Sequence, residues 1–293
     1  MTSRLADSLL QLLPRAGVCV LSRTRFIPVL HVERLQDDSS FARTLAFAEG
    51  YLGATGERAL LTVITPMAPM LAMELKAAGL SEDFYRERIG SLARFADIGL
   101  HGHYLREPSS PIRPVHNYWN EASIIAAQIE LERDWLERRG LMTHRAYSAG
   151  WWHLDAGLVK TLAALGFRMD FSSSTARFND SPGAVRSERF RRSPVIFAHP
   201  DAPGILAVWA VSSLGDSAAR SFVVRRALTA FPKLLFRKEE SFLSLYSHDW
   251  DLNVEGALKT VETLKAHGAG FVSLQGLLDR GLAGSSANQA VPS

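Results

Sequence analysis

The stretch Asp97-Ile98-Gly99-Leu100-His101-Gly102-His103-Tyr104 combines a strand-like pattern with two histidines, and the rest of the chain can be placed around it. Its first half has the apolar pattern of a buried strand, and it then runs into a glycine between two imidazoles, which can titrate and bind metals. His101 and His103 stand two residues apart, so in an extended segment both side chains lie on one side and could converge on one ion or one substrate group. Two histidines beside a turn also occur with purely structural hydrogen bonds, so the surrounding elements decide between the two interpretations.

The composition is that of an ordinary globular protein. The 293 residues are 47% hydrophobic and 22% charged, which is enough to bury a substantial core. The formal net charge of +3 is small and scattered, and no basic run alternates with aromatic residues, so we expect no nucleic-acid partner. Cys19 is the single cysteine, which excludes an internal disulfide and a cysteine-rich metal site and fits a reducing compartment.

No segment has the length of a membrane span, which needs about 20 consecutive apolar residues. Residues 1–17 contain five leucines but are interrupted by Asp7 and stopped by Pro14. This pattern indicates a short amphipathic helix, because a secretory signal needs a longer apolar region and a small-residue cleavage site. We therefore expect a cytoplasmic protein without a membrane span, and the sequence does not indicate its oligomeric state.

Apolar runs typical of strands alternate along the chain with segments typical of helices. The predicted strands are residues 25–33, 59–66, 97–104, 144–150, 167–172, 204–211, 241–248 and 271–274. The predicted helices are residues 41–51, 67–80, 81–96, 117–139, 153–166, 222–237 and 253–268. This alternation predicts a parallel sheet with helices outside, and seven or eight strands favour a barrel over an open sheet. We expect an α/β fold with a single distorted (β/α) barrel of about seven strands over residues 25–283. An N-terminal helix and lead-in would precede it over residues 1–24, and a disordered tail would follow over residues 284–293.

Chemically active side chains lie at or just past the ends of several predicted strands, where barrel enzymes carry their catalytic groups. They are Glu33, His101 with His103, Arg145 and His248. Each has a plain structural alternative: Glu33 could be a solvent-facing charge, Arg145 could pair with a carboxylate below the site, and His248 could be hydrogen-bonded within its own turn.

Three segments, in the right order, resemble motifs of the polysaccharide deacetylase superfamily, the NodB-like group that contains the family-four carbohydrate esterases. Asp97–Gly102 is similar to the metal-histidine motif, and Leu243–His248 is similar to the last motif. Residues 145–173 resemble the arginine and tryptophan motif with its "Gly-Phe, Asp, Ser-Ser" continuation. The resemblance covers about residues 26–278 and implies a distorted NodB-like barrel. It also implies a hydrolase that removes an N-acyl group, such as acetyl, from an amino sugar of a surface polysaccharide or its precursor.

The resemblance implies a divalent metal of the zinc type, held by one aspartate and two histidines in the pattern His-x-x-x-His. His101 matches the first histidine, but Leu105 stands at the second position, so His103 would substitute for it. Arg34 stands where the metal aspartate is expected, and an arginine cannot be a ligand because it stays protonated.

Several alternatives remain for the missing carboxylate ligand. Glu33, which aligns with the family's general base, could itself be the ligand, or His31 could join the site. Asp37 or Asp38 could instead reach it from the following loop. A further alternative is that no metal binds.

The resemblance also implies roles in catalysis and substrate binding. His248 would protonate the leaving amine, Glu33 would act as base or ligand, and Arg145 would orient the base. The expected substrate-binding residues are Trp151, Trp152, Tyr147 and His116. Aromatic rings stack on the apolar faces of sugars, and His116 follows a proline-rich loop that could form a pocket rim.

Two rival functions follow from the departures at Arg34 and Leu105. The first is a metal-independent amide hydrolase on the same barrel. The second is a catalytically silent relative that binds carbohydrate.

Overall fold

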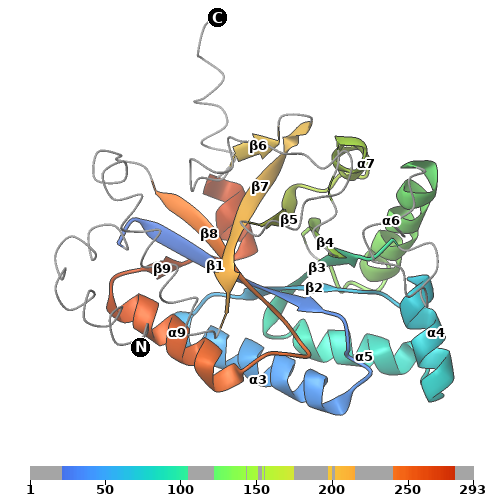
Figure 1. Ribbon diagram of the computed structural model, residues 1–293, viewed down its shortest axis with the longest axis horizontal. Helices are drawn as coiled ribbons and strands as arrows, with labels where there is room; N and C mark the ends of the chain where they lie inside the picture. Colours follow the sequence, from blue (N-terminus) through green and yellow to red (C-terminus); the bar gives the residue numbers. More distant parts are fainter. Residues whose placement is uncertain are drawn as a thin grey trace, which may run out of the picture.

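The structure is a computed structural model that describes residues 22–104, 122–142, 144–150, 154, 156–174, 197–199, 202–214 and 240–280 (Figure 1). Its strands are β1 (Thr24–Val32), β2 (Ala59–Val63), β3 (Ala96–Gly102), β4 (Ala146–Ala149), β5 (Met169–Ser174), β6 (Phe197–His199), β7 (Ala202–Ser213), β8 (Ser241–His248) and β9 (Gly270–Phe271). Its helices are α3 (Asp38–Thr55), α4 (Pro69–Ala78), α5 (Glu82–Leu92), α6 (Ala122–Glu137), α7 (Ala156–Ala164) and α9 (Val254–Ala266).

Within the described residues, seven parallel strands are linked into a closed ring. The pairings run β1–β2–β3–β4–β5–β7–β8 and return to β1. Strand β1 pairs with β8 along its whole length, but on its other edge it pairs with β9 at Arg25 and Phe26 and with β2 only from Val29 onward. Strands β1 and β2 therefore meet at one end of the barrel only, which makes the barrel distorted. The predicted fold of about seven strands is confirmed.

Two apolar clusters show which side chains face the barrel interior. Val29 and Leu60 belong to the smaller cluster, whereas their chain neighbours Leu30 and Leu61 belong to the larger cluster, which includes residues of α3, α5, α6 and α9. This split follows from the two-residue period of a strand. Odd-numbered positions of β1 therefore point into the barrel, and so does His101 on β3, because its neighbour Leu100 packs in the larger cluster.

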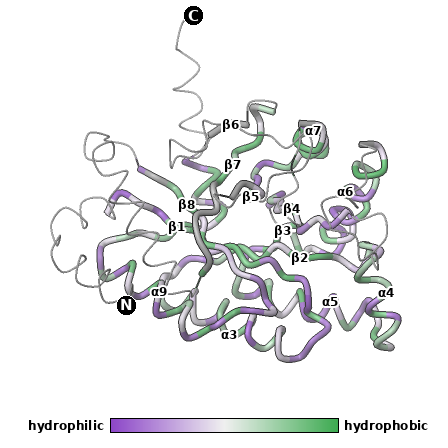
Figure 2. The backbone as a smooth tube through the Cα atoms, in the orientation of Figure 1, coloured by the Kyte–Doolittle hydropathy of each residue, from purple (hydrophilic) through white to green (hydrophobic). Residues whose placement is uncertain are grey.

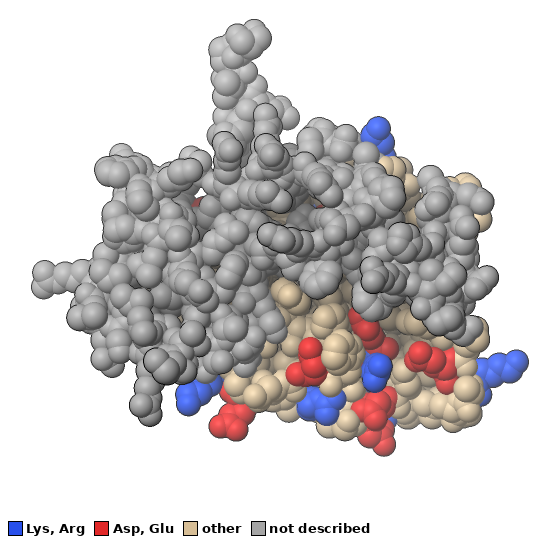
Figure 3. Space-filling model, in the orientation of Figure 1, with Lys and Arg blue, Asp and Glu red and all other residues tan. Residues whose placement is uncertain are grey.

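Helices cover the outside of the sheet. Figure 1 shows α3, α5 and α9 together along one side of it, and α3 contacts both of the others. Figure 2 shows helix α3 alternating between hydrophilic and hydrophobic residues, as expected when one face of a helix is buried and the other is solvated. On the described part of the face in Figure 3, acidic and basic side chains are interspersed. No helix in the described part of the chain is long and apolar enough to cross a membrane.

The predicted and observed elements differ in a few places. No strand was predicted between residues 173 and 203, but β6 lies there and pairs antiparallel with β7. The last strand is shorter than predicted, because β9 ends at Phe271 and a helical turn begins at Leu274. The predicted helices over residues 1–17 and 222–237 and the tail over residues 284–293 lie outside the described residues.

Candidate metal centre

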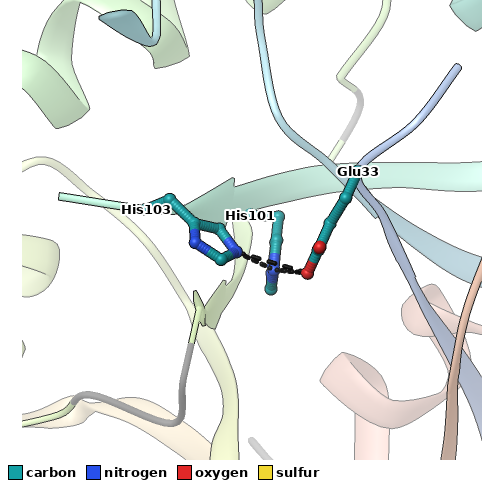
Figure 4. Close-up of side chains that lie close together, drawn as sticks. All are labelled: Glu33, His101 and His103. Carbon is teal, nitrogen blue, oxygen red and sulfur yellow. Dashed lines mark hydrogen bonds and ion pairs between the residues drawn. The ribbon is translucent and has the colours of Figure 1, made fainter. Parts of the chain in front are cut away.

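Three side chains from the C-terminal ends of β1 and β3 converge on one point. Glu33 Oε1 lies 3.2 Å from His101 Nε2 and 3.3 Å from His103 Nε2, and the two Nε2 atoms lie 3.0 Å apart. Figure 4 shows the three groups pointing toward one another. Among the described residues, this is the one group of three or more potential ligands that could hold a metal ion.

Hydrogen bonds alone cannot account for all three of these short distances. Each Nε2 carries at most one proton and the ionised Glu33 carries none. If both histidines donate to Glu33, the two N–H groups face each other across the 3.0 Å edge. If one histidine donates to the other, the accepting Nε2 carries no proton, so it cannot donate to the carboxylate. A cation between the three atoms would satisfy every edge.

The donor set fits a divalent ion of the zinc type. Zinc is bound by imidazole nitrogens at about 2.0–2.1 Å and by carboxylate oxygens at about 2.0–2.2 Å, most often in tetrahedral geometry. Two ligands of such a tetrahedron lie roughly 3.3–3.5 Å apart, and the three observed distances of 3.0–3.3 Å are close to this value. Glu33, His101 and His103 would therefore supply three ligands and leave one position open.

The fold explains why these particular residues meet. His101 points into the barrel from the end of β3, and His103 follows two residues later on the same side. The His103 ring packs against Gly150, just after β4, where a Cβ atom would lie only 2.5 Å from the imidazole. A glycine is therefore required at position 150 for His103 to reach the cluster.

Asp249 fixes the segment that carries Glu33. Its Oδ1 accepts a hydrogen bond from the Glu33 N–H at 3.1 Å, and its Oδ2 accepts one from the Arg34 N–H at 2.7 Å. Asp249 is fully buried, and it comes directly after the last residue of β8. The two strand ends are thus joined by a carboxylate that holds the Glu33 backbone in place.

His31 packs against the cluster through the His101 ring. Its ring stacks on His101 with centroids 4.5 Å apart, and its Nε2 lies 2.8 Å from Ser148 Oγ. His31 is buried and comes from an inward-facing position of β1. It was considered as a ligand, but its Nε2 faces Ser148 in this structure, so its observed role is to support the His101 ring.

His248 lies beside His31 at the end of β8. It is paired in register with His31, and the two rings meet edge to face with centroids 5.2 Å apart. The side chain of His248 is 25% exposed, and its other face stacks on Trp250. Its Nδ1 lies 3.9 Å from Asp251 Oδ2, beyond hydrogen-bond length. His248 is therefore the histidine of this group that solvent or substrate reaches most easily.

The protonation states suit a cation site. Burial opposes ionisation of Glu33, but hydrogen bonds from His101 and His103 outweigh it and hold the pKa of Glu33 well below its usual value. Burial lowers the pKa of His101 to about 4, against the influence of Glu33, so its ring is neutral at neutral pH. Burial also lowers the pKa of His31, with further contributions from His101 and His248. The cluster thus offers one carboxylate and neutral imidazole, which are the forms that bind metals.

The two alternative carboxylate ligands lie elsewhere. Asp37 caps helix α3, where its Oδ1 accepts from the Ser40 N–H at 2.7 Å and from the Ser39 hydroxyl at 2.6 Å. Asp38 is exposed and forms an ion pair with Arg88. Neither belongs to the cluster, and Glu33 is the carboxylate that the structure places beside the histidines.

Two other expected site residues point away from the cluster. Arg145 precedes β4 instead of following it, and it donates two hydrogen bonds of 2.5 Å and 3.0 Å to Glu137. This is the pairing with a carboxylate below the site that was considered as its structural alternative. Tyr147 is fully buried and meets Phe167 edge to face on the helix side of the sheet, away from the cluster. The reason is strand alternation: Ser148 points inward, so its neighbour Tyr147 points outward.

The remaining expected substrate-binding residues, His116, Trp151 and Trp152, lie outside the described residues. Sequence reasoning missed three residues that shape the site: Ser148, Gly150 and Asp249. The position of Ser148 could have been inferred from strand alternation around Tyr147. The contacts of Gly150 and Asp249 have no local sequence signal.

No profile of a known protein family matches this sequence, and no curated protein matches it. Several solved structures share its fold, including the three that follow. A candidate polysaccharide deacetylase from Mycobacterium smegmatis is 14% identical, with a TM-score of 0.54 and 92% of each chain covered. A GH57 branching enzyme from Thermococcus kodakaraensis, in complex with glucose, is 11% identical, with a TM-score of 0.52 over 88% of this chain and 71% of that one. A 4-α-glucanotransferase from Thermococcus litoralis is 14% identical, with a TM-score of 0.51, and the match covers 88% of this chain but only 40% of the enzyme. The chain therefore has the distorted NodB-like (β/α) barrel fold that its three motifs predicted.

Proposed function

We propose that this protein is a metal-dependent hydrolase that removes an N-acyl group, such as acetyl, from an amino sugar of a polysaccharide or its precursor. The observation that carries the proposal is the triangle of Glu33, His101 and His103 at the mouth of the barrel. The likeness to a candidate polysaccharide deacetylase supports the substrate class.

A divalent ion bound by these three residues would polarise the amide carbonyl and make water a stronger nucleophile. Glu33 uses Oε1 in the triangle, which leaves Oε2 to accept the proton of the attacking water. His248, partly exposed beside His31, is the group that delivers a proton to the leaving amine. Arg145 has no part in this mechanism, because it is bound to Glu137 at the other end of β4.

One observation favours a second candidate, a catalytically silent carbohydrate-binding protein. Glu33 is the only carboxylate of the cluster among the described residues, and Asp249 is occupied by two backbone N–H groups. If Glu33 cannot serve as ligand and base together, the site binds a metal and a sugar without turnover.

The test is zinc titration combined with acetate release from N-acetylglucosamine oligosaccharides, in the wild type and two variants. We expect one zinc per chain and measurable acetate release in the wild type. His101→Ala should lose both, whereas His248→Ala should keep zinc and lose turnover. His267→Ala is the matched control, because His267 closes helix α9 and its Nδ1 lies 2.7 Å from the Thr263 carbonyl.

Each alternative has its own result. Turnover that persists in both His101→Ala and His248→Ala would overturn the mechanism. Turnover that is unaffected by a chelator would support the metal-independent hydrolase, and sugar binding without acetate release would support the silent protein.

A further inference from the structure

An exposed indole lies directly beside His248. Trp250 is 43% exposed, and its ring stacks on the His248 ring with centroids 4.9 Å apart and planes 25° apart. The turn that carries it is firmly held, because Arg43 Nη2 donates to the carbonyl oxygens of Asp249 and Trp250 at 3.3 Å and 3.4 Å. The carboxylate of Asp249 ties the same turn to the end of β1. The indole is therefore held at the surface by its surroundings.

A cation lies next to this indole. The guanidinium carbon of Arg34 is 5.9 Å from the centre of the Trp250 ring, and the Arg34 side chain is exposed. Within the described parts of the chain, Arg34 forms no ion pair. Burial raises the pKa of Glu74, and the nearby charge of Arg34 opposes this shift. Glu74 accepts a hydrogen bond from Gln36 at 2.6 Å. The charge of Arg34 is thus available to a ligand.

We propose that Trp250 and Arg34 form a subsite for an acidic saccharide unit, next to the sugar whose amide is cleaved. The indole stacks on the apolar face of a sugar ring, and the planar guanidinium binds a carboxylate or phosphate through paired hydrogen bonds. The place of this subsite beside the cleaved amide rests on the proposed function, whereas its preference for an acidic sugar rests on Arg34 and Trp250 alone. The substrate class is therefore an acidic amino-sugar saccharide or a sugar phosphate.

The test compares two pairs of probes by isothermal titration calorimetry. The first pair is a tetrasaccharide of alternating glucuronic acid and N-acetylglucosamine against the neutral N-acetylglucosamine tetramer. The second pair is N-acetylglucosamine 1-phosphate against N-acetylglucosamine. We expect the wild type to bind at least one acidic probe about 10-fold more tightly than its neutral counterpart, and less so at high salt. The pair that shows the preference identifies the anion as carboxylate or phosphate.

The variants separate charge from stacking. Arg34→Gln should remove the preference for the acidic probe, and Trp250→Ala should weaken acidic and neutral probes alike, by about 10-fold. Arg86→Gln and Leu131→Ala are matched controls, because they alter an exposed cation on α5 and an exposed apolar residue on α6. Both controls should bind as the wild type does.

The failure of this proposal can be told apart from failure of the proposed function by repeating the titrations in His101→Ala, which should lack turnover. A preference that persists there and disappears in Arg34→Gln supports the subsite, even if the wild type releases no acetate. Equal binding of acidic and neutral probes, no binding of either acidic probe at millimolar concentration, or an unchanged preference in Arg34→Gln would overturn the subsite, even if acetate is released.

Discussion

Two pairs of contacting side chains lie at opposite ends of neighbouring strands, and each pair contains a residue that was expected to function. At the C-terminal end of β3, His101 is fully buried and meets Glu33, whose side chain is 20% exposed. Before the N-terminal end of β4, Arg145 meets Glu137, with side chains 38% and 30% exposed. A third side chain, His103, joins the first pair, and its Nε2 lies close to both Glu33 Oε1 and His101 Nε2. Hydrogen bonds cannot satisfy all three of these short distances at once. The second pair is complete by itself, because Arg145 also donates to the Leu165 carbonyl at 2.9 Å.

The comparison shows that a strand position is a weak guide to function unless the side chain is also buried, points inward and converges with others. In a surface ion pair the two charges are already matched, so a ligand gains less there than at a buried set of converging groups. The following predictions test this difference, from the largest expected effect to the smallest.

Gly150→Ala should destroy the convergence without removing any ligand. The new Cβ would lie 2.5 Å from the His103 ring, so that flexible side chain must turn away while the backbone stays in place. We expect the zinc affinity to fall by at least about 100-fold, because one of three ligands is lost and even an outer partner is worth about 10–100-fold. The measurement is competition with a zinc-binding dye, together with the thermal unfolding midpoint.

Gly53→Ala is the control for this variant, because no atom lies within 4 Å of the Cβ position there. It should leave zinc binding unchanged and help helix α3 slightly, since alanine favours a helix more than glycine does. If Gly150→Ala binds zinc as the wild type does, His103 is not a ligand.

Asp249→Asn should weaken the same site from outside. One backbone N–H would keep an oxygen acceptor, but the other would face the new amide group, which is a donor, so the segment that carries Glu33 would loosen. We expect the zinc affinity to fall by about 10-fold, at the lower end of the range for an outer partner. Asp251→Asn is the matched control two residues further on, where the side chain is 44% exposed. Equal zinc affinities in the two variants would contradict the positioning role of Asp249.

Much of this arrangement could be predicted from the sequence, because apolar runs and charged ends mark strands locally. The prediction for β8, residues 241–248, has the observed limits, and the convergence of His101 and His103 follows from their spacing. Arg145 was grouped with residues at the C-terminal ends of strands, although it stands near the start of the predicted strand 144–150. The observed β4 begins after it, at Ala146. The bond from Asp249 to Glu33 joins residues 216 positions apart, and such a contact depends on how the strand ends meet in the barrel.

Glu132→Gln tests burial without convergence. Glu132 is fully buried on α6, where its carboxylate accepts hydrogen bonds from Thr65 at 3.1 Å and from Gln128 at 2.9 Å. Burial raises the pKa of Glu132 from 4.5 to about 7, and the two hydrogen bonds oppose the shift. Between these two pH values the folded state holds a proton that the unfolded state has released, so the stability falls as the pH rises through this window.

The Glu132→Gln variant cannot ionise and should lose this fall. Relative to the wild type it should gain on the order of 2 kcal/mol in unfolding free energy between pH 5 and pH 8, measured by urea unfolding. Glu130→Gln, on the exposed side of the same helix, should show the same pH dependence as the wild type, because Glu132 is still present. Zinc affinity should be unchanged in both variants, because neither residue belongs to the cluster. A difference between wild type and Glu132→Gln that stays constant over this range would show that Glu132 ionises normally.

Arg145→Ala should have the smallest effect, and it tests the other half of the comparison. The ion pair with Glu137 is partly exposed, so its loss should lower the unfolding free energy by about 1 kcal/mol or less, and less still at high salt. Zinc affinity and turnover should equal those of the wild type, because Arg145 precedes β4 whereas the cluster lies beyond its other end. A loss of turnover with normal folding and normal zinc binding would show that Arg145 acts on the site through the strand. In that case an ion pair at the far end of a strand could still have a function. Burial and convergence of side chains would then no longer distinguish the functional cluster from the Arg145–Glu137 pair.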